Sequence, residues 1–468
     1  MSENNAPGDF RDTLYTVDKH GKRRWVYPEL IKGRWFYRRA VVAYALIAFY
    51  ISMPWISIGG KQGIRVDIPG RKFIFFGQEF WATDTHFLFL ILGSAAFSLF
   101  LFTALVGRVW CGWACPETVF LEFVFRPIER LLEGNAAQRK RLDQSPWTFN
   151  KLWRKAAKHF LSAVISWVIA SSALAYFVGR EPLINMMCNW PHHNPIPFTV
   201  TCVLMGLMAF QFGWFREQFC TVLCPYARFQ SVLMDQNSIV VGYDIVRGEP
   251  RGKAKKSEQD QTKGHCVDCG LCVRVCPTGI DIRNGLQLEC VACTSCVDAC
   301  DSIMKKLGRP EGLIRYDTEN RLLGRSLVRK ILRPRPFLYF AILSVFISGL
   351  VYSWSYHQPA EFQVLRKRGP QPFTTMAEGK ISNQLEIHAA NKSDKPIKIK
   401  FSLLGNDQVS FVTPENPLTV APQSIKVAPA FAIFPLTVLA KGSASISIKG
   451  ETDDGFVFIQ KYSLIGPG

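Results

Sequence analysis

Eight cysteines between residues 266 and 300 form the densest group of metal-binding side chains in this chain of 468 residues. They fall into two runs of the same spacing, C-x2-C-x2-C-x3-C: Cys266, Cys269, Cys272 and Cys276, then Cys290, Cys293, Cys296 and Cys300. Three thiolates from one tight loop and a fourth from the other run can surround one cube of iron and sulfide. Thiols at this spacing therefore indicate iron–sulfur chemistry, in which single electrons are taken up and released.

The spacing predicts two interlocked 4Fe–4S clusters in a domain of the two-cluster ferredoxin type. One cluster would be held by Cys266, Cys269, Cys272 and Cys300, and the other by Cys290, Cys293, Cys296 and Cys276. Pro277 follows the first run as expected, but Asp301 stands where a second proline is usual. Two structural zinc sites and a disulfide scaffold are the alternatives, and both suit this spacing less well.

Two further cysteine pairs occur in W-C-G-W-A-C-P at residues 110–116 and F-C-T-V-L-C-P at residues 219–225, namely Cys111 with Cys115 and Cys220 with Cys224. Each follows an apolar stretch and precedes an amphipathic one, which indicates an internal repeat. A spacing of four predicts both sulfurs of a pair on one helical face, and the proline predicts a kink or an end there. Such thiols suit Cu(I), zinc, another iron–sulfur centre or a dithiol relay, with plain packing as the alternative.

A weaker candidate is the loop between the third and fourth apolar stretches, with Met186, Met187, Cys188, His192 and His193. Thioether, thiol and imidazole groups together are typical of copper sites. Apolar loop residues at a membrane surface would have a similar composition, so the loop stays a secondary candidate.

Five uncharged stretches must position these thiols: 40–58, 87–106, 160–179, 196–215 and 337–356. At roughly 1.5 Å per helical residue, each could cross an apolar layer of roughly 30 Å. Hydrophobic residues make up 48% of the chain, and its formal charge is +19. We therefore predict five membrane spans, with the basic excess against anionic lipid rather than nucleic acid.

Basic residues predict the orientation of the spans, because lysine and arginine collect on the cytoplasmic side. Residues 19–39 carry eight basic side chains against one acidic, and residues 126–158 carry nine against three, whereas loops 59–86 and 180–195 are poorer in positive charge. This predicts residues 216–336 inside the cell and 357–468 outside. The prediction agrees with the cysteines, because thiolate clusters need a reducing compartment.

The predicted fold is a multi-domain membrane protein: a five-helix transmembrane bundle, an inserted α+β two-cluster ferredoxin domain and a C-terminal immunoglobulin-like β-sandwich. Strand-like runs at 385–389, 397–403, 409–412, 444–448 and 456–462 favour the sandwich. Residues 247–264 have the composition of a linker. The predicted domains are a cytoplasmic N-terminal segment (1–39), four spans with both C-x3-C-P repeats (40–235), the cytoplasmic ferredoxin domain (236–335), the fifth span (336–357) and the periplasmic sandwich (358–468).

Residues 108–117, 219–228 and 265–304, with the five spans and the exported β-domain, resemble the CcoG/FixG/RdxA family of cytochrome c oxidase accessory proteins. The resemblance implies a protein of the bacterial inner membrane that reduces Cu(II) to Cu(I) for a cbb-type cytochrome c oxidase. It implies that Cys111, Cys115, Cys220 and Cys224 handle copper and that the eight ferredoxin cysteines hold iron. It also implies the oxidase and its assembly factors as partners.

We expect single electrons to pass through the iron–sulfur centres to Cu(II) near the C-x3-C-P thiols. Membrane proteins of nitrate and nitrous oxide reduction share the same motifs, so a quinol-linked relay to a periplasmic reductase is the first alternative. A non-enzymatic assembly scaffold is the second. The electron donor and the oligomeric state, including a homodimer, stay open at this point.

Overall fold

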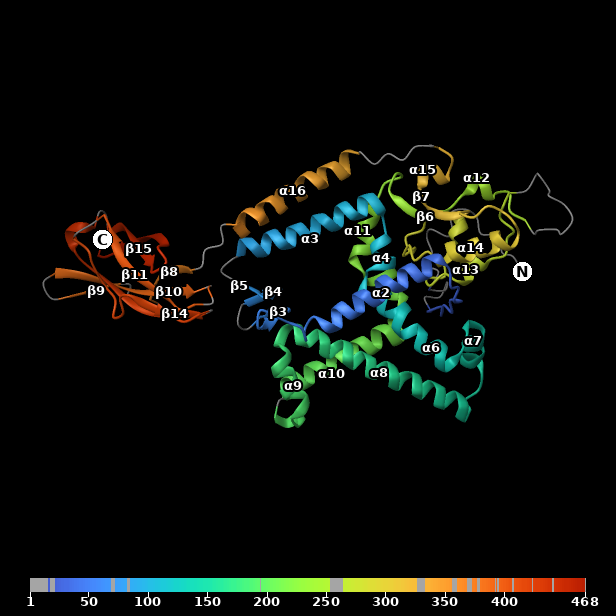
Figure 1. Cartoon of the computed structure of the whole chain (residues 1–468), viewed down its shortest axis with the longest axis horizontal. Helices are drawn as coiled ribbons and strands as arrows, with labels where there is room; N and C mark the ends of the chain where they lie inside the picture. The colour runs from blue at the N-terminus through green and yellow to red at the C-terminus, as the bar shows by residue number, and fades with distance from the viewer. Residues whose placement is uncertain are drawn as a thin grey trace. The chain divides into compact units, whose positions relative to one another are not determined.

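The computed structural model of this chain describes residues 16, 22–68, 72–81, 85–193, 195–252, 264–325, 333–355, 360–367, 373–376, 379–391, 393, 395–405, 408–422, 424–439 and 442–467. The chain divides into two compact units, Met1–Leu350 and Val351–Gly468. The first unit contains the long helices and every cysteine, and the second is built of strands (Figure 1). The chemistry of the thiols therefore belongs to the first unit.

Among the described residues, four helices are long and apolar enough to cross a membrane: His86–Val106, Phe149–Val178, Pro195–Phe215 and Pro334–Ser355. They correspond to α3 (Thr85–Val106), α8 (Phe149–Val178), α10 (Pro195–Phe210) with its π-helical end η3 (Gln211–Phe215), and α16 (Pro334–Ser355). The last four predicted stretches are therefore helical, although α8 begins eleven residues before the predicted 160. These helices are those of a membrane protein.

The first predicted span, residues 40–58, is only partly helical. Helix α2 (Arg34–Ser52) ends six residues early, because the chain turns and pairs β1 (Ser57–Ile58) with β2 (Lys61–Gln62). Three arginines lie in the first six residues of α2, so it lacks the apolar length of the other four helices. The predicted loop 59–86 also contains a second antiparallel sheet, made of β3 (Ile64–Asp67), β4 (Lys72–Phe75) and β5 (Gln78–Trp81).

Helices α3 and α16 pack against each other through aromatic rings (Figure 1). The ring of Phe346 lies 5.5 Å from the rings of Phe89 and Phe97, measured between centroids. A Cβ atom at Gly93 would overlap the Phe346 ring, so the glycine makes this approach between the helices possible. Small residues at helix interfaces are typical of membrane bundles, where close packing replaces the hydrophobic effect.

Each C-x3-C-P segment leads into a helix that begins at its proline. Helix α4 (Val109–Trp113) is followed by α5 (Pro116–Phe120), η1 (Leu121–Phe125), α6 (Arg126–Glu133) and α7 (Ala136–Gln144), and η4 (Phe219–Leu223) is followed by α11 (Pro225–Leu233). Cys115 and Cys224 have extended backbones (φ −62°, ψ 125° and φ −65°, ψ 112°), because a residue before proline avoids the helical region. The prediction that each pair shares one helical face is therefore wrong. Proline occupies the first helical turn, where its missing N–H costs nothing.

The cysteine-rich domain is closed by two antiparallel strands, β6 (Ile239–Tyr243) and β7 (Ile314–Thr318). Its short helices are α12 (Ile245–Gly248), α13 (Leu271–Arg274), η5 (Ile282–Asn284), α14 (Ser295–Lys306) and α15 (Glu319–Leu322). The predicted linker 247–264 begins in α12, and its residues 253–263 lie outside the described residues. The strands and helices enclose a core in which Val241, Ile280 and Met304 pack against several of the cysteines.

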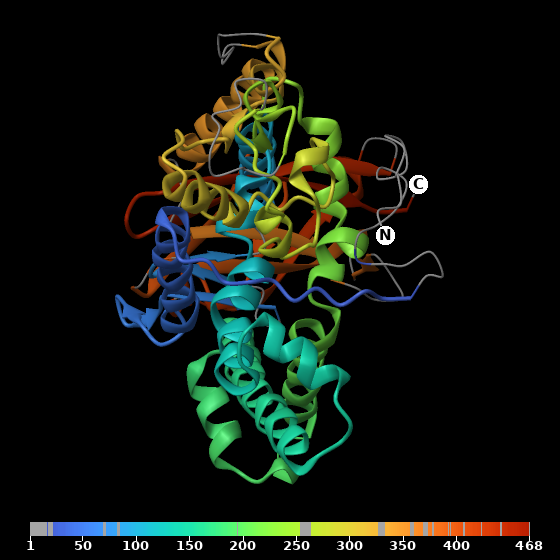
Figure 2. The same cartoon turned by 90° about the vertical axis from the view of Figure 1, so that its right-hand side faces the viewer.

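Helix α2 begins inside this domain, and a side chain of α14 caps it. The backbone N–H groups of Trp35 and Phe36 donate to the carboxylate of Asp298 at 3.1 and 2.8 Å. A Cβ atom at Gly33 would overlap Asp298, which explains the glycine at this position. An acceptor and a negative charge at a helix N-terminus stabilise the helix. The contact therefore ties the start of α2 to a helix that carries two of the eight cysteines, Cys296 and Cys300 (Figure 2).

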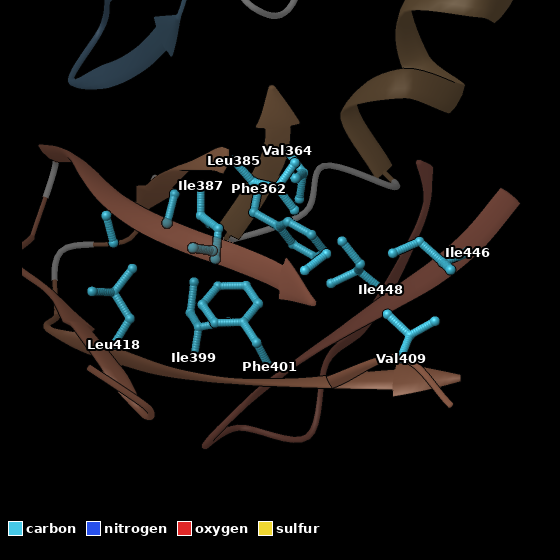
Figure 3. Packing of buried hydrophobic residues seen from close by; sticks show 14 of the residues in the cluster. Phe362, Val364, Leu385, Ile387, Ile399, Phe401, Val409, Leu418, Ile446 and Ile448 are labelled. Atoms are coloured by element: carbon cyan, nitrogen blue, oxygen red, sulfur yellow. The ribbon is translucent and has the colours of Figure 1, made fainter. Parts of the chain in front are cut away.

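The second unit is a sandwich of two antiparallel sheets, ordered β12-β14-β10-β8 (with β9 on β10) and β13-β11-β15-β16. The strands are β8 (Ala360–Arg366), β9 (Thr374–Thr375), β10 (Lys380–Asn391), β11 (Ile397–Leu404), β12 (Ser410–Val412), β13 (Leu418–Val420), β14 (Ser424–Pro435), β15 (Ser443–Thr452) and β16 (Val457–Ile465). Leu385 and Ile387 of one sheet face Ile399 and Phe401 of the other in the core (Figure 3). All five predicted runs lie in or next to strands, so the sandwich is confirmed.

Replacement of Asp298 by alanine should destabilise the first unit by about 1 kcal/mol, because two N–H groups at the start of α2 lose their acceptor. The expected result is a lower midpoint of thermal helix loss in detergent, followed by circular dichroism. Asp298→Asn keeps an acceptor oxygen and should lie between Asp298→Ala and the unchanged chain. Equal midpoints for all three proteins would contradict the capping role.

Candidate functional site

Two cavities in the cysteine-rich domain are lined by the two predicted groups of cysteines. The first is lined by Cys266, Cys269, Cys272 and Cys300. The second is lined by Cys276, Cys290, Cys293 and Cys296, and also by Cys272. The fold thus brings one cysteine of each run to the other run, as the interlocked spacing predicts.

The two cysteine loops share a backbone device that turns their sulfurs inward. Asp268 and Gly270 have positive φ angles (49° and 64°) in the first loop. Ala292 and Thr294 have them (52° and 60°) at the equivalent positions of the second loop. Left-handed residues within a turn form concave rows of N–H groups, which bind anionic groups such as iron–sulfur centres. The repeated geometry gives both cavities the same local construction.

Burial controls the protonation of these thiols. It raises the pKa of Cys272 and that of Cys290 to about 12, and it raises the pKa of Cys296 as well. Thiols of this kind become thiolates at neutral pH when cationic iron replaces their protons. Four soft donors around each enclosed cavity fit the coordination of a 4Fe–4S cluster.

The four C-x3-C-P thiols gather in one neighbourhood. Burial raises the pKa of Cys220, and the charges of Glu117, Cys115, Cys111 and Cys224 raise it further. The two repeats also touch directly, because the Gln230 side-chain amide of α11 donates to the sulfur of Cys111 at 3.3 Å. The proline repeats therefore place two thiol pairs together, although neither pair lies on a single helix face.

The surroundings of Cys115 combine a helix terminus with a buried carboxyl group. The backbone N–H groups of Glu117 and Thr118 donate to its sulfur and lower its pKa, but burial outweighs them and raises it. Burial also raises the pKa of Glu117 to about 7, against the charge of Arg216. A titratable carboxyl group thus lies beside the thiols, where protons must leave if a soft cation binds.

The second cysteine cavity lies against the first C-x3-C-P segment. A Cβ atom at Gly112 would come within 2.6 Å of the Ala292 carbonyl oxygen and 2.7 Å of the Val291 carbonyl oxygen. Arg39, only 3% exposed, donates to the carbonyl oxygens of Gly112 at 2.9 Å and Cys293 at 2.6 Å. The backbone next to Cys111 is therefore in van der Waals contact with the loop of Cys290 and Cys293.

Aromatic side chains reinforce this contact. The indole N–H of Trp113 donates to the Tyr316 hydroxyl at 2.9 Å, and that hydroxyl donates to the Ala292 carbonyl oxygen at 3.1 Å. Trp35 packs edge-on against both rings, with centroids 6.1 Å from Trp113 and 5.2 Å from Tyr316. The result is a dry, rigid contact between the thiol region and the second cavity.

Three buried arginines donate to carbonyl oxygens around the second cavity. Besides Arg39, Arg108 donates to Cys290 at 3.3 Å and to Ala227 of the second repeat at 2.9 Å. Arg126, which is 1% exposed, donates to Pro277 at 3.4 Å. Positive charge and hydrogen bonding near an iron–sulfur centre favour its reduced form. The three arginines therefore favour negative charge in the second cavity.

The structure does not build a metal site from the segment between Met186 and His193. Met187 and Cys188 are exposed near the end of α9 (Arg180–Cys188), whereas Met186 packs partly buried against Leu174 and its neighbours. His192 and His193 stack on each other in the turn η2 (Pro191–His193), 4.1 Å apart between centroids. Within the described part of the chain, no three His, Cys, Asp or Glu side chains form a group that could hold a single metal ion.

Sequence reasoning missed most residues that join the two thiol regions. In the sequence, Arg39 and Arg126 contribute only to the positive charge that predicts the orientation of the spans. No sequence pattern marks Gly112 or Gln230 as a contact residue. The repeated C-x3-C-P pattern was the one clue that the two segments meet. The partners of Arg39 are backbone carbonyls, which have no sequence signature.

Family models match three segments of the chain. A 4Fe-4S binding domain matches residues 86–134, and a 4Fe-4S dicluster domain matches residues 215–319. The third, described as an IG-like fold at the C-terminal of FixG, matches residues 350–467. The matches cover the first C-x3-C-P segment, all eight ferredoxin-type cysteines and the sandwich.

Known relatives cover most of the chain. It is 34% identical to the nitrogen fixation protein FixG of Rhizobium meliloti in an alignment of 421 positions that covers 82% of this chain and 80% of FixG. It is 33% identical to protein RdxA of Cereibacter sphaeroides, over 83% of this chain and 84% of RdxA. Protein RdxB of the same organism is 34% identical over 86% of this chain and 87% of RdxB.

Replacement of Gly112 by alanine should displace the loop of Cys290 and Cys293, because the added Cβ overlaps two carbonyl oxygens. We expect the purified protein to lose up to about half of its iron and acid-labile sulfide, the share of one cluster in two. The matched control is Gly206→Ala on α10, where a Cβ meets no atom within 4 Å. Full iron content in Gly112→Ala would show that the close contact is dispensable for the second site.

Proposed function

The chain belongs to the FixG/RdxA family, and from this premise we propose that it is a cupric reductase supplying Cu(I) for the assembly of a cbb-type cytochrome c oxidase. Its 4Fe–4S domains and long apolar helices make it an iron–sulfur electron-transfer protein of a membrane. The proposal adds the electron acceptor, Cu(II), and the place where it is reduced.

We assign the iron–sulfur ligands to the two groups of cysteines that line the cavities. Cys266, Cys269, Cys272 and Cys300 would hold one cluster, and Cys276, Cys290, Cys293 and Cys296 the other. When bound, the clusters supply centres that accept and release one electron each. The single-electron character suits copper, because Cu(II) becomes Cu(I) by gaining one electron.

The contact between Gly112 and the loop of Cys290 and Cys293 is the observation that carries the proposal. It places Cys111 next to the cavity that the three arginines make favourable for negative charge. The four gathered thiols offer soft ligands, which prefer Cu(I) to Cu(II) and so stabilise the product of reduction. Two thiolates satisfy Cu(I), so a copper ion in transit needs no larger group of ligands.

Copper binding and proton release are coupled in this arrangement. Burial raises the pKa of Cys111 to about 11, so this thiol is protonated at neutral pH before the metal arrives. Each thiol that binds copper gives up one proton. Glu117, beside Cys115, is placed to receive it.

In the proposed orientation the protein lies in the bacterial inner membrane with the cysteine domain in the cytoplasm. The four long apolar helices, with α2 as a fifth crossing, then place the sandwich of residues 358–468 in the periplasm, where the oxidase and its assembly factors would be its partners. The clustered basic residues at 19–39 and 126–158 support this orientation. The reducing cytoplasm also suits the free thiols.

Two other functions are compatible with the same family. A relay to a periplasmic reductase would use the clusters but would not need copper at the C-x3-C-P thiols. An assembly scaffold would need neither electron transfer nor a reducible centre. Reduction of Cu(II) by the purified chain, and its dependence on these thiols, separates the three.

Replacement of both Cys111 and Cys115 by serine should lower the rate of Cu(II) reduction by about tenfold or more, because serine oxygen binds Cu(I) poorly. The assay mixes anaerobic protein, dithionite-reduced and desalted, with Cu(II) and a chromogenic Cu(I) chelator. Cys202→Ser, in span α10, is the matched control and should reduce copper at the normal rate. An unchanged rate in the double variant would remove copper handling from these thiols.

Replacement of Arg39 by methionine should make one iron–sulfur centre harder to reduce, because a buried positive charge next to Cys293 is lost. Anaerobic redox titration followed by EPR should show one midpoint potential lowered and the other unchanged. Arg39→Lys keeps the charge and should shift that potential less. Equal shifts of both centres, or none, would contradict the assignment of Arg39 to the second cavity.

A further inference from the structure

A larger cavity, of about 400 Å³, lies apart from both cysteine groups. Its wall is formed by the extended N-terminal residues, by α6 and α7, and by the ends of the candidate spans α8 and α10–η3. None of the fourteen cysteines lines it. The cavity therefore lies where two membrane helices meet the amphipathic helix that follows the first C-x3-C-P segment, and the reductase mechanism above does not use it.

The charged groups in the wall of this cavity form ion pairs with one another. The Glu129 carboxylate contacts Arg139 at 3.0 Å and Arg216 at 2.9 Å. The other wall carboxylates are paired in the same way, Glu133 with Lys155 and Lys158 at 2.9 Å each, and Asp143 with Lys155 at 2.5 Å. Each of the four wall cations already contacts a carboxylate, so a phosphate group would have to compete with these ion pairs. A neutral ligand with hydroxyl and carbonyl oxygens can use the same groups as hydrogen-bond donors and acceptors.

The rest of the wall is apolar and aromatic. Trp25 and Trp214 line the cavity, and the Arg23 guanidinium lies over the Trp25 ring at 3.8 Å from its centroid. The span side is formed by the small residues Ala209 and Gly213, and a Cβ atom at Gly213 would meet nothing within 4 Å. Flat aromatic walls, small residues and a few polar groups suit a planar ring held by its oxygen atoms.

The polar wall connects to the second cysteine cavity through two buried side chains. Glu217, the neighbour of Arg216, lies 3.4 Å from Arg126. Arg126 donates to the carbonyl oxygen of Pro277, the residue after Cys276. Buried contacts thus connect the wall of the cavity, through Glu217 and Arg126, to the cysteine loop that follows Cys276.

We propose that this cavity binds the head group of a membrane quinol, the electron donor to the iron–sulfur domain; this rests on the proposed electron-transfer function. A quinol that becomes a quinone breaks two O–H bonds and releases two electrons and two protons. The two one-electron centres of the dicluster domain accept the two electrons. Both protons leave through the exposed imidazole of His159, which lines the cavity, to water.

The test fills the cavity from its apolar side. Gly213→Leu adds a side chain where the structure has open space, so the fold should tolerate it while the ring is excluded. Gly206→Leu, on the same span but outside the cavity, is the matched control. The full chain in detergent is titrated with decylubiquinone and, separately, with menaquinone-4, and quenching of tryptophan fluorescence reports binding. No cluster is needed for this readout.

We expect saturable binding of at least one quinone. Gly213→Leu should weaken this binding about tenfold or more, and a tenfold change in the dissociation constant corresponds to about 1.4 kcal/mol. Gly206→Leu should leave the binding unchanged. Equal binding by all three proteins, or no saturable binding of either quinone, would overturn the proposal. Loss of co-purifying phospholipid from Gly213→Leu without a change in quinone binding would assign the cavity to lipid instead. Cu(II) reduction driven by dithionite should be normal in Gly213→Leu. If the unchanged chain failed to reduce Cu(II), that result would contradict the reductase function but not quinone binding in this cavity.

Discussion

The close approach of the Gly112 backbone to the carbonyls of Val291 and Ala292 is the constraint on which the rest of the first unit depends. No side chain larger than hydrogen fits between the two segments. Arg39 donates to the carbonyl oxygens of Gly112 and Cys293, and the Thr294 hydroxyl also donates to that of Cys293. The contact brings together two groups of thiols that lie about 180 residues apart in the chain.

The membrane helices and the cysteine domain are joined by more than a linker. Asp298 of α14 caps the start of α2, so a helix that carries two of the eight cysteines also holds the first long helix of the chain. Arg108 and Arg126 also join the helical segments to the cysteine domain, because both donate to carbonyl oxygens of the cysteine loops. Buried charges are costly unless hydrogen-bonded, and here their cost is offset by carbonyls and carboxylates. The network fixes the distance between the electron-carrying centres and the thiols.

The two C-x3-C-P segments act as one site because proline starts a helix in each of them. The preceding cysteine is extended, and its sulfur lies at the N-terminus of the new helix. In the first segment, two N–H groups donate to that sulfur. In the second, Gln230 reaches back to Cys111 of the first. Pairing of this kind explains why the repeat occurs twice, since each half supplies part of the surroundings of the other.

The sequence by itself determined the iron–sulfur chemistry, the last four apolar helices and the strand-built second unit. These follow from local rules: the cysteine spacing, the length of uncharged stretches, and alternation along strands. The first span was predicted too long, because a short hairpin after Ser52 has no strong sequence signal. The helix-face prediction for the thiol pairs was wrong because proline can begin a helix as well as end one. Only the tertiary structure decided that Gly112, Arg39 and the Cys293 loop meet, because that contact joins backbone groups, which every residue possesses.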